Sequence, residues 1–294
     1  MHLLVLAMLS LAFFVLSVVV GIVFGVSDGR ETGAESLFLV WNSISQVMMF
    51  GLPTLIVSAV YFRGQQLEYL KFDMCGRRWL SALAGVVVMV FLTPLTDWLT
   101  TWNDSWHWSG AWEAFERELR RVGEESQAVM SRILENGNLP LNLLCVALIP
   151  ALCEELFFRA GIQNLLQHWL SRSSSLITHQ SPMSTHVAVW VTAAIFSLAH
   201  GEVFAFLPRF LLGALLGYLY VYGRSLLVNV TAHFVNNAII VVAYALKSDG
   251  IILFDPSGSL EVPLLLTTAC TLAALGVFYL AFLRQPTPNN RPVQ

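Results

Sequence analysis

The sequence is poor in charge. Charged residues make up only 12% of the 294 positions, whereas hydrophobic residues make up 56%. A soluble domain carries about twice that charged fraction, so this composition excludes an ordinary water-soluble protein. The net charge of -3 provides no general attraction for nucleic acid, and we expect no nucleic-acid partner.

Several motifs of familiar enzymes are also missing. The four cysteines, Cys75, Cys145, Cys153 and Cys270, have no paired spacing, which excludes a disulfide framework and a zinc knuckle. The chain has no His-Glu-x-x-His, so the usual zinc-peptidase helix is absent. It has no Gly-x-Ser-x-Gly either, which argues against a serine nucleophile. An internal repeat and a low-complexity segment are likewise not found.

What the sequence does contain is a series of apolar runs, each close to the ~20 residues that cross a bilayer as a helix. They predict an all-α, polytopic transmembrane bundle of about eight spans, forming a single membrane domain over residues 1–294. The expected spans are 3–26, 36–62, 79–98, 139–167, 186–205, 206–222, 226–246 and 263–283. The boundary between the fifth and sixth spans, near Phe206 to Pro208, is the least sharply marked.

Basic residues predict the orientation of the bundle. They gather in the loops 63–78 and 168–185, in the turn near Arg224 and in the C-terminal tail. Since positive charge favours the cytoplasmic side, we expect a multi-pass protein with both termini in the cytoplasm. The loop 99–138 does not fit this pattern, because it holds four arginines beside seven acidic residues.

That loop has an amphipathic pattern of its own. After a group of tryptophans typical of a membrane interface, apolar residues recur at helical spacing with Glu and Arg between them. They are Phe115, Leu119, Val122, Val129 and Ile133. The pattern predicts an interfacial helix between the third and fourth spans. A solvated helix packed on the protein's own loops is the alternative.

The fourth span carries charges where hydrocarbon is expected. Glu154, Glu155 and Arg159 lie within it, and each charge at a bilayer centre costs about 3 kcal/mol. Glu155 and Arg159 are four residues apart and share a helix face, so we expect an ion pair that leaves Glu154 as the free carboxylate. Pro150 either kinks the span or opens a helix there. A purely structural network that lines a polar cavity is the alternative.

Two later spans carry further polar residues at one-turn spacing. Phe196 and His200 lie on one face of the fifth span, and His233 and Asn237 lie on one face of the seventh. A single intramembrane histidine is commonly a packing residue, but ionisable groups on three separate spans tend to converge in the bundle interior.

Such a set suits three chemistries. Glu154 could act as general base on a water, with histidine and asparagine stabilising an oxyanion. Glu154, His200 and His233 could instead be three ligands of a catalytic zinc. The same residues could also form a proton relay for transport, although the paired broken helices of transporters are not evident.

The three motifs occur in order as Glu154-Glu155-x-x-x-Arg159, Phe196-x-x-x-His200 and His233-x-x-x-Asn237. This arrangement resembles the CAAX-protease and bacteriocin-processing (CPBP, or Abi) family of intramembrane proteases, which includes the type II CAAX prenyl endopeptidase. The resemblance covers about residues 139–246, which would form the catalytic core.

The resemblance implies an intramembrane endopeptidase that acts on a protein or peptide substrate at the lipid bilayer. It assigns water activation to Glu154, assistance to His200 and oxyanion stabilisation to His233 and Asn237. Glu155, Arg159 and Phe196 would support the site. Both a metal-free mechanism and a single divalent metal such as zinc are compatible with the family, and the asparagine favours the former.

The resemblance also suggests a bacterial cytoplasmic membrane protein. The competing function is a non-catalytic scaffold or bacteriocin-immunity protein with the same fold. One added acid, Glu202, follows His200 closely and is expected at the membrane edge, where Arg209 could pair with it.

Overall fold

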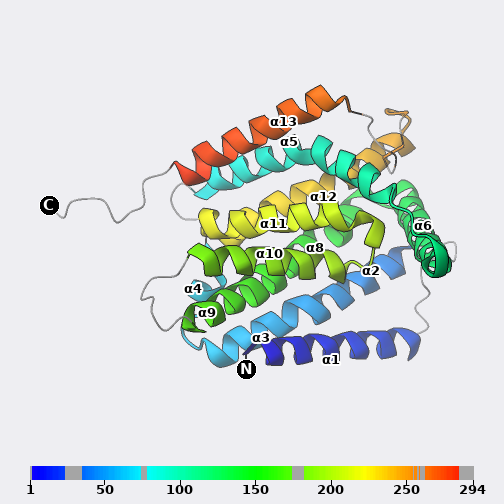
Figure 1. Ribbon diagram of the computed structural model, residues 1–294. Coiled ribbons are helices and arrows are strands. Elements are labelled where there is room, and N and C mark those ends of the chain that lie inside the picture. The colour runs from blue at the N-terminus through cyan, green and yellow to red at the C-terminus, as the bar shows by residue number, and fades with distance from the viewer. Residues whose placement is uncertain are drawn as a thin grey trace.

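The computed structural model describes residues 2–23, 35–73, 78–173, 182–253, 255–256, 258 and 262–284 (Figure 1). Its α-helices are α1 (His2–Val23), α2 (Glu35–Gln46), α3 (Leu52–Tyr61), α4 (Gln66–Leu70), α5 (Arg78–Asp104), α6 (Glu113–Asn136), α7 (Leu139–Asn142), α8 (Ile149–Glu154), α9 (Asn164–Ser173), α10 (Pro182–Ala199), α11 (Phe206–Gly223), α12 (Leu226–Ser248) and α13 (Leu264–Phe278). Four π-helical segments continue these helices, namely η1 (Val47–Gly51), η3 (Leu143–Leu148), η4 (Glu155–Gln163) and η6 (Tyr279–Leu283). Two short 3₁₀ turns are η2 (Gly110–Trp112) and η5 (Val203–Ala205).

Within the residues that the structure describes, seven stretches are long and apolar enough to cross a membrane, and a shorter apolar helix, Met183–Ala199, adds an eighth candidate. The seven are His2–Ile22, Glu35–Tyr61, Arg78–Asp104, Leu139–Ser171, Val203–Gly223, Leu226–Ser248 and Leu264–Leu283. These helices confirm the predicted all-α bundle with its eight apolar segments.

Several span boundaries differ from the sequence prediction, and two of them concern the ends of the fifth and third helices. The fifth helix ends at Ala199 rather than near 205, because Gly201 adopts a φ of +72° and Glu202 is extended. The third helix continues to Asp104 instead of ending near 98. This extension carries Asn103 to the level of the connection between α10 and α11.

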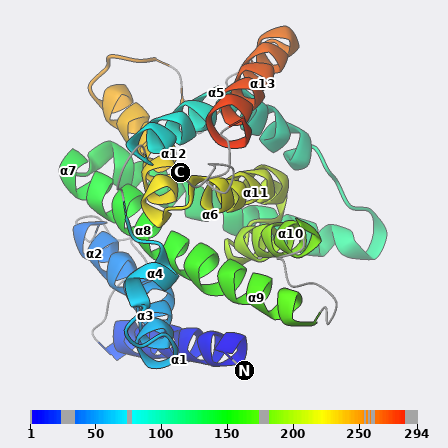
Figure 2. The ribbon, with the colours of Figure 1, turned by 90° about the vertical axis from the view of Figure 1, so that its left-hand side faces the viewer.

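The fourth span is the centre of the bundle. It is the most enclosed, with 61% of its apolar window buried, whereas only 11% is buried in the first and last spans. Figure 2 shows α8 and α9 running between α1 to α3 on one side and α10 to α12 on the other. The outer spans therefore present apolar surface to lipid, and the charged residues of the fourth span are kept away from it.

Both ends of the described chain lie at the same end of the bundle, while α6 crosses the opposite end (Figure 1). The C-terminal half of α6 packs on the spans through buried Ile133 and Leu134. Its N-terminal half extends beyond them, and Phe115 and Val122 are exposed there. The apolar face of this helix therefore packs on the spans near the C-terminal end and remains exposed near the N-terminal end.

Glu116 fastens the first turns of α6 to the preceding loop. Its carboxylate accepts hydrogen bonds from the Trp108 N–H at 2.5 Å and from Arg120 Nε at 2.8 Å, and its Oε1 lies 2.9 Å from His107 Nδ1. These groups, with the Trp108 N–H first, lower the pKa of Glu116 to about 2. The contacts therefore stabilise the folded loop only while the carboxylate is ionised.

We expect this loop to loosen in acid. Because the folded pKa is below the unfolded value of about 4.3, the stabilisation is complete above that value and is lost as the pH falls toward 2. Tryptophan emission followed between pH 6 and pH 2 should report the change. Glu116→Gln should remove most of that dependence, and an identical titration in this variant would contradict the assignment.

α10 and α11 pack closely because glycines face the contact. A Cβ built on Gly217 would lie 2.8 Å from Val189 Cγ1 and 3.0 Å from Gln163 Oε1. One built on Gly213 would lie 3.2 Å from the backbone of Ala193. Small residues of this kind let two membrane helices approach each other.

Gly217→Val should therefore destabilise the bundle. The larger side chain needs space occupied by Val189 and Gln163, and overpacking of this kind costs about 1–3 kcal/mol. Thermal unfolding of the purified protein in detergent measures the effect. Gly276→Val is a matched control, because no described neighbour lies within 4 Å of its added Cβ. Equal melting temperatures for the two variants would argue against this packing.

Candidate active site

The charged segment lies where the fourth span changes its helical form. α8 ends at Glu154 and η4 begins at Glu155, so the two carboxylates lie on either side of the junction. Pro150 is in the first turn of α8, directly after η3. Pro150 therefore lies at the start of a helical segment, which is one of its two expected effects. The span as a whole continues without interruption from Leu139 to Ser171. π-helical segments are frequent at functional sites.

His233 of α12 lies between the two carboxylates. Its Nδ1 is 2.9 Å from Glu155 Oε1, and its Nε2 is 3.8 Å from Glu154 Oε2. All three side chains are buried, with at most 6% of each residue exposed. Since a carboxylate can only accept, Nδ1 carries a hydrogen and donates it to Glu155, and Nε2 is the nitrogen directed at Glu154.

Glu155 is held by three residues. Besides His233, its Oε2 accepts a hydrogen bond from Asn229 Nδ2 at 3.1 Å and lies 3.2 Å from Arg159 Nε. The last contact is the ion pair expected from the four-residue spacing. Neither Glu155 nor Arg159 is exposed. Glu155 is thus committed to structural contacts.

Glu154 has a different environment. Among the described residues it accepts no hydrogen bond, and its carboxylate interacts electrostatically with both His233 and His200. It therefore keeps its acceptor positions for another group, such as a water or a substrate. The two adjacent glutamates are distinguished by their partners.

Phe196 of α10 connects the elements of the site. Its ring centroid is 4.8 Å from that of His200 and 6.1 Å from that of His233. The Arg159 guanidinium lies 5.2 Å from the same ring, within the range of a cation–π contact. Phe196 is buried and forms the wall on which both histidines and the arginine meet.

His200 lies just beyond the last residue of α10, at the exposed side of the site. Its Nδ1 is 2.8 Å from the Phe196 carbonyl oxygen, so Nδ1 donates to that oxygen. In the neutral ring, Nε2 is then the nitrogen able to accept a proton. Of the two histidines of the site, His200 is exposed and His233 is buried.

Asn237 is less closely joined to this group. It lies one turn beyond His233, is half-buried, and its Oδ1 accepts a hydrogen bond of 3.3 Å from Asn236 Nδ2. The structure shows no contact between Asn237 and the two glutamates within the described ranges. At the outer edge, Arg209 Nη2 lies 2.6 Å from Glu202 Oε2, so these two residues form the pair considered from the sequence.

The zinc alternative required Glu154, His200 and His233 to act as one ligand set. Over the part of the chain that the structure describes, no three His, Cys, Asp or Glu side chains form a group that could hold a metal ion. We therefore derive no step through a metal.

Asn229 is a site residue that sequence reasoning did not single out. It lies one turn before His233 on α12, and its amide donates to Glu155 and to the Leu216 carbonyl, the latter at 2.5 Å. The signal was its four-residue spacing from His233, which continues the spacing between His233 and Asn237. Without knowledge of what faces α12, that signal does not identify the partner.

Comparison with known proteins adds one finding. Residues 136–239 match the family model described as Rce1-like, type II CAAX prenyl endopeptidase Rce1-like. This segment contains all three of the polar motifs and both glutamates. No curated protein and no solved structure matches the chain.

Proposed function

We propose that this chain is an intramembrane endopeptidase, because residues 136–239 match the family model of the Rce1-like type II CAAX prenyl endopeptidases. Glu154 is its general base, and residues 139–246 are the catalytic core of a single membrane domain. The observation that carries this assignment is the difference between the two glutamates. Glu155 is bound by His233, Arg159 and Asn229, whereas Glu154 is buried beside two imidazoles and accepts no hydrogen bond from the described residues.

In the first step Glu154 takes a proton from a water molecule, whose oxygen attacks the carbonyl carbon of the scissile peptide bond. The tetrahedral intermediate that forms carries an oxyanion. The proton then passes to the leaving amine nitrogen as the C–N bond breaks, which yields an amine and a carboxylic acid that then loses its proton to water. His200 assists this proton transfer through Nε2, because its Nδ1 is held by the Phe196 carbonyl.

His233 and Asn237 stabilise the oxyanion. With Nδ1–H donated to Glu155, the Nε2 of His233 can carry a second proton, and the imidazolium ring then offers Nε2–H to the developing charge. Glu155 balances that positive charge. Asn237, one turn along the same helix, supplies an amide donor from the half-buried side of the site.

The substrate is a protein or peptide at the membrane. The long apolar spans make the chain a multi-pass membrane protein. We place it in the cytoplasmic (inner) membrane of a bacterium with both termini in the cytoplasm, which agrees with the position of both described chain ends at one end of the bundle (Figure 1).

The test uses the purified full-length protein in lipid vesicles with two quenched fluorescent peptides. One carries a farnesylated CAAX sequence, and the other is the same peptide without the prenyl group. Cleavage of either, with products identified by mass, supports the peptidase, and the ratio shows whether the lipid is recognised. If the protein cleaves neither peptide and no protein in a mixture of bacterial membrane proteins, the proposal is contradicted and a non-catalytic scaffold is favoured.

We expect the activity to survive removal of divalent metals. The reason is that the carboxylate and the two histidines of the site do not form a ligand group. Activity before and after dialysis against a strong chelator, together with metal analysis of the same sample, provides the measurement. Loss on chelation with recovery on adding zinc would instead make a metal part of the reaction.

A further inference from the structure

His200 begins the short connection between α10 and α11, and its own hydrogen bonds are made to the last turn of α10, from its N–H to the Ser197 carbonyl and from Nδ1 to the Phe196 carbonyl. After Ala199 the backbone passes through Gly201, with a φ of +72°, and extended Glu202 before α11 begins at Phe206. A glycine at positive φ adopts many other conformations at little cost. The path of the chain after His200 therefore depends on contacts made to residues 203–207.

Asn103 supplies two of these contacts from the last turn of α5. Its Oδ1 accepts a hydrogen bond of 2.9 Å from the Leu207 N–H, and its Nδ2 donates one of 3.4 Å to the Val203 carbonyl. The Leu207 N–H is among the first of α11, which have no acceptor within their own helix. Asn103 thus acts as an N-cap for a helix more than a hundred residues further along the chain.

A second layer of contacts, made by Arg120 and Trp108 to Phe204, lies outside Asn103. The Arg120 guanidinium lies 3.8 Å from the centre of the Phe204 ring and donates hydrogen bonds to the carbonyls of Asp104 and Trp106. The Trp108 ring also contacts Phe204, at 5.7 Å between centroids. The connection between α10 and α11 is therefore held against the end of α5 by the buried Asn103 and, on its outer side, by Arg120 and Trp108.

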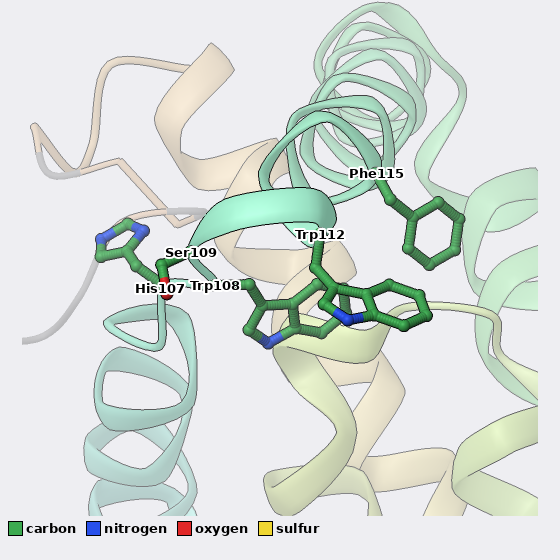
Figure 3. Close-up of a pocket in the computed structure, with 5 residues that line it drawn as sticks. All are labelled: His107, Trp108, Ser109, Trp112 and Phe115. Atoms are coloured by element: carbon green, nitrogen blue, oxygen red, sulfur yellow. The ribbon is translucent and has the colours of Figure 1, made fainter.

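Figure 3 shows the outer side of this layer. Trp108 and Trp112 of the turn before α6 and Phe115 of its first turns line a hollow of about 560 Å³, together with His107 and Ser109. Since Trp108 contributes to both the hollow and the Phe204 contact, the loop before α6 and the connection that bears His200 form one packed unit.

We propose that Asn103 is a positioning residue for His200, and that it keeps the imidazole in place for proton transfer by fixing residues 203–207, which follow it directly, to α5. This role rests on the proposed peptidase function only for its catalytic consequence. Asn103 is 1% exposed, which matches a residue whose amide is used entirely for internal contacts. The placement of His200 itself can be tested without any substrate.

The substrate-free experiment is ethoxycarbonylation of histidines in the full-length protein by diethyl pyrocarbonate, with the rate at each histidine measured by mass spectrometry. In Asn103→Leu, which has similar size but no polar atoms, the rate at His200 should change severalfold. The rate at His186, an exposed histidine near the other end of α10, should stay constant. In Asn103→Asp the acceptor for Leu207 is kept, and the rate at His200 should remain near that of the natural chain.

The kinetic experiment uses the same variants and, as substrate, the peptide that the natural protein cleaves. Asn103→Leu should lower kcat at least about tenfold with KM within about twofold, because a displaced catalytic group costs rate more than binding. Asn103→Asp should restore most of kcat. If neither the natural protein nor any variant cleaves a peptide, the peptidase assignment fails. The labelling rates still decide the placement of His200 in that case.

Asn142→Leu is the matched control. Asn142 is likewise 1% exposed, and its amide donates to the Ile133 and Leu134 carbonyls at the other end of α6. It should lose stability without a change at His200. If Asn103→Leu does not fold, Arg120→Met tests the same attachment at a residue that is partly exposed. Unchanged labelling of His200 in folded Asn103→Leu, or in Arg120→Met where it takes the place of that variant, would overturn the proposal, and so would an equal change in Asn142→Leu.

Discussion

Glu154→Gln abolishes peptide hydrolysis and leaves the protein folded. The glutamine has nearly the same shape, but its amide cannot take a proton from water, so the reaction loses its base. General bases contribute about 10²- to 10⁴-fold, and kcat should fall at least about a thousandfold. The fold should survive, because Glu154 accepts no hydrogen bond from the described residues. Peptide cleavage and thermal unfolding of the same preparation provide the two measurements.

The comparison with Glu155→Gln makes this prediction specific. That variant alters a residue bound by His233, Arg159 and Asn229, so it should lower stability as well as activity. Loss of activity without loss of stability is expected only at Glu154. A normal cleavage rate in Glu154→Gln would show that another group activates the water, and the assignment of the base would be wrong.

Arg159→Met has the largest expected effect on stability. It removes the cation beside Glu155 in a place that is not exposed at all, and breaking a buried pair by removing one partner costs about 3–5 kcal/mol. The purified yield and the melting temperature should both fall. The Phe196 ring also loses its contact with the guanidinium, although methionine retains part of the packing there.

Two further variants separate charge from packing. Glu155→Gln combined with Arg159→Met removes both charges and should recover part of the stability lost in Arg159→Met alone. Arg117→Met breaks an exposed pair with Glu113 at the same four-residue spacing and should change stability by no more than about 0.5 kcal/mol. If Arg159→Met melted like the natural chain, the pair with Glu155 would contribute no net stability.

Much of the fold was predictable because spans depend on local properties. A helix in a bilayer satisfies its own backbone groups, so its existence follows from the length and hydropathy of one segment. The eight apolar segments and the amphipathic helix α6 were predicted in this way, and the structure confirms them. The exceptions were helix ends such as Asp104 and Ala199, where turn conformation and tertiary contacts determine the last turn.

The site was predictable only as far as it depends on residues that are close together on one helix. Four-residue spacing placed Arg159 beside Glu155 and His200 beside Phe196, and both contacts are observed. The catalytic roles of Glu154, His200, His233 and Asn237 remain predictions. Spacing could not show that His233 lies between both glutamates or that Asn229 binds Glu155, because these contacts join spans far apart in the chain.

The sequence by itself determined a bundle of apolar helices with charges on the fourth span, since helical periodicity and hydropathy are properties of neighbouring residues. Only the tertiary structure decided which glutamate is bound and which is free. It also decided that α5 supplies the cap for α11. Both outcomes depend on which helix faces meet across the bundle, and that is set by packing between residues about a hundred positions apart.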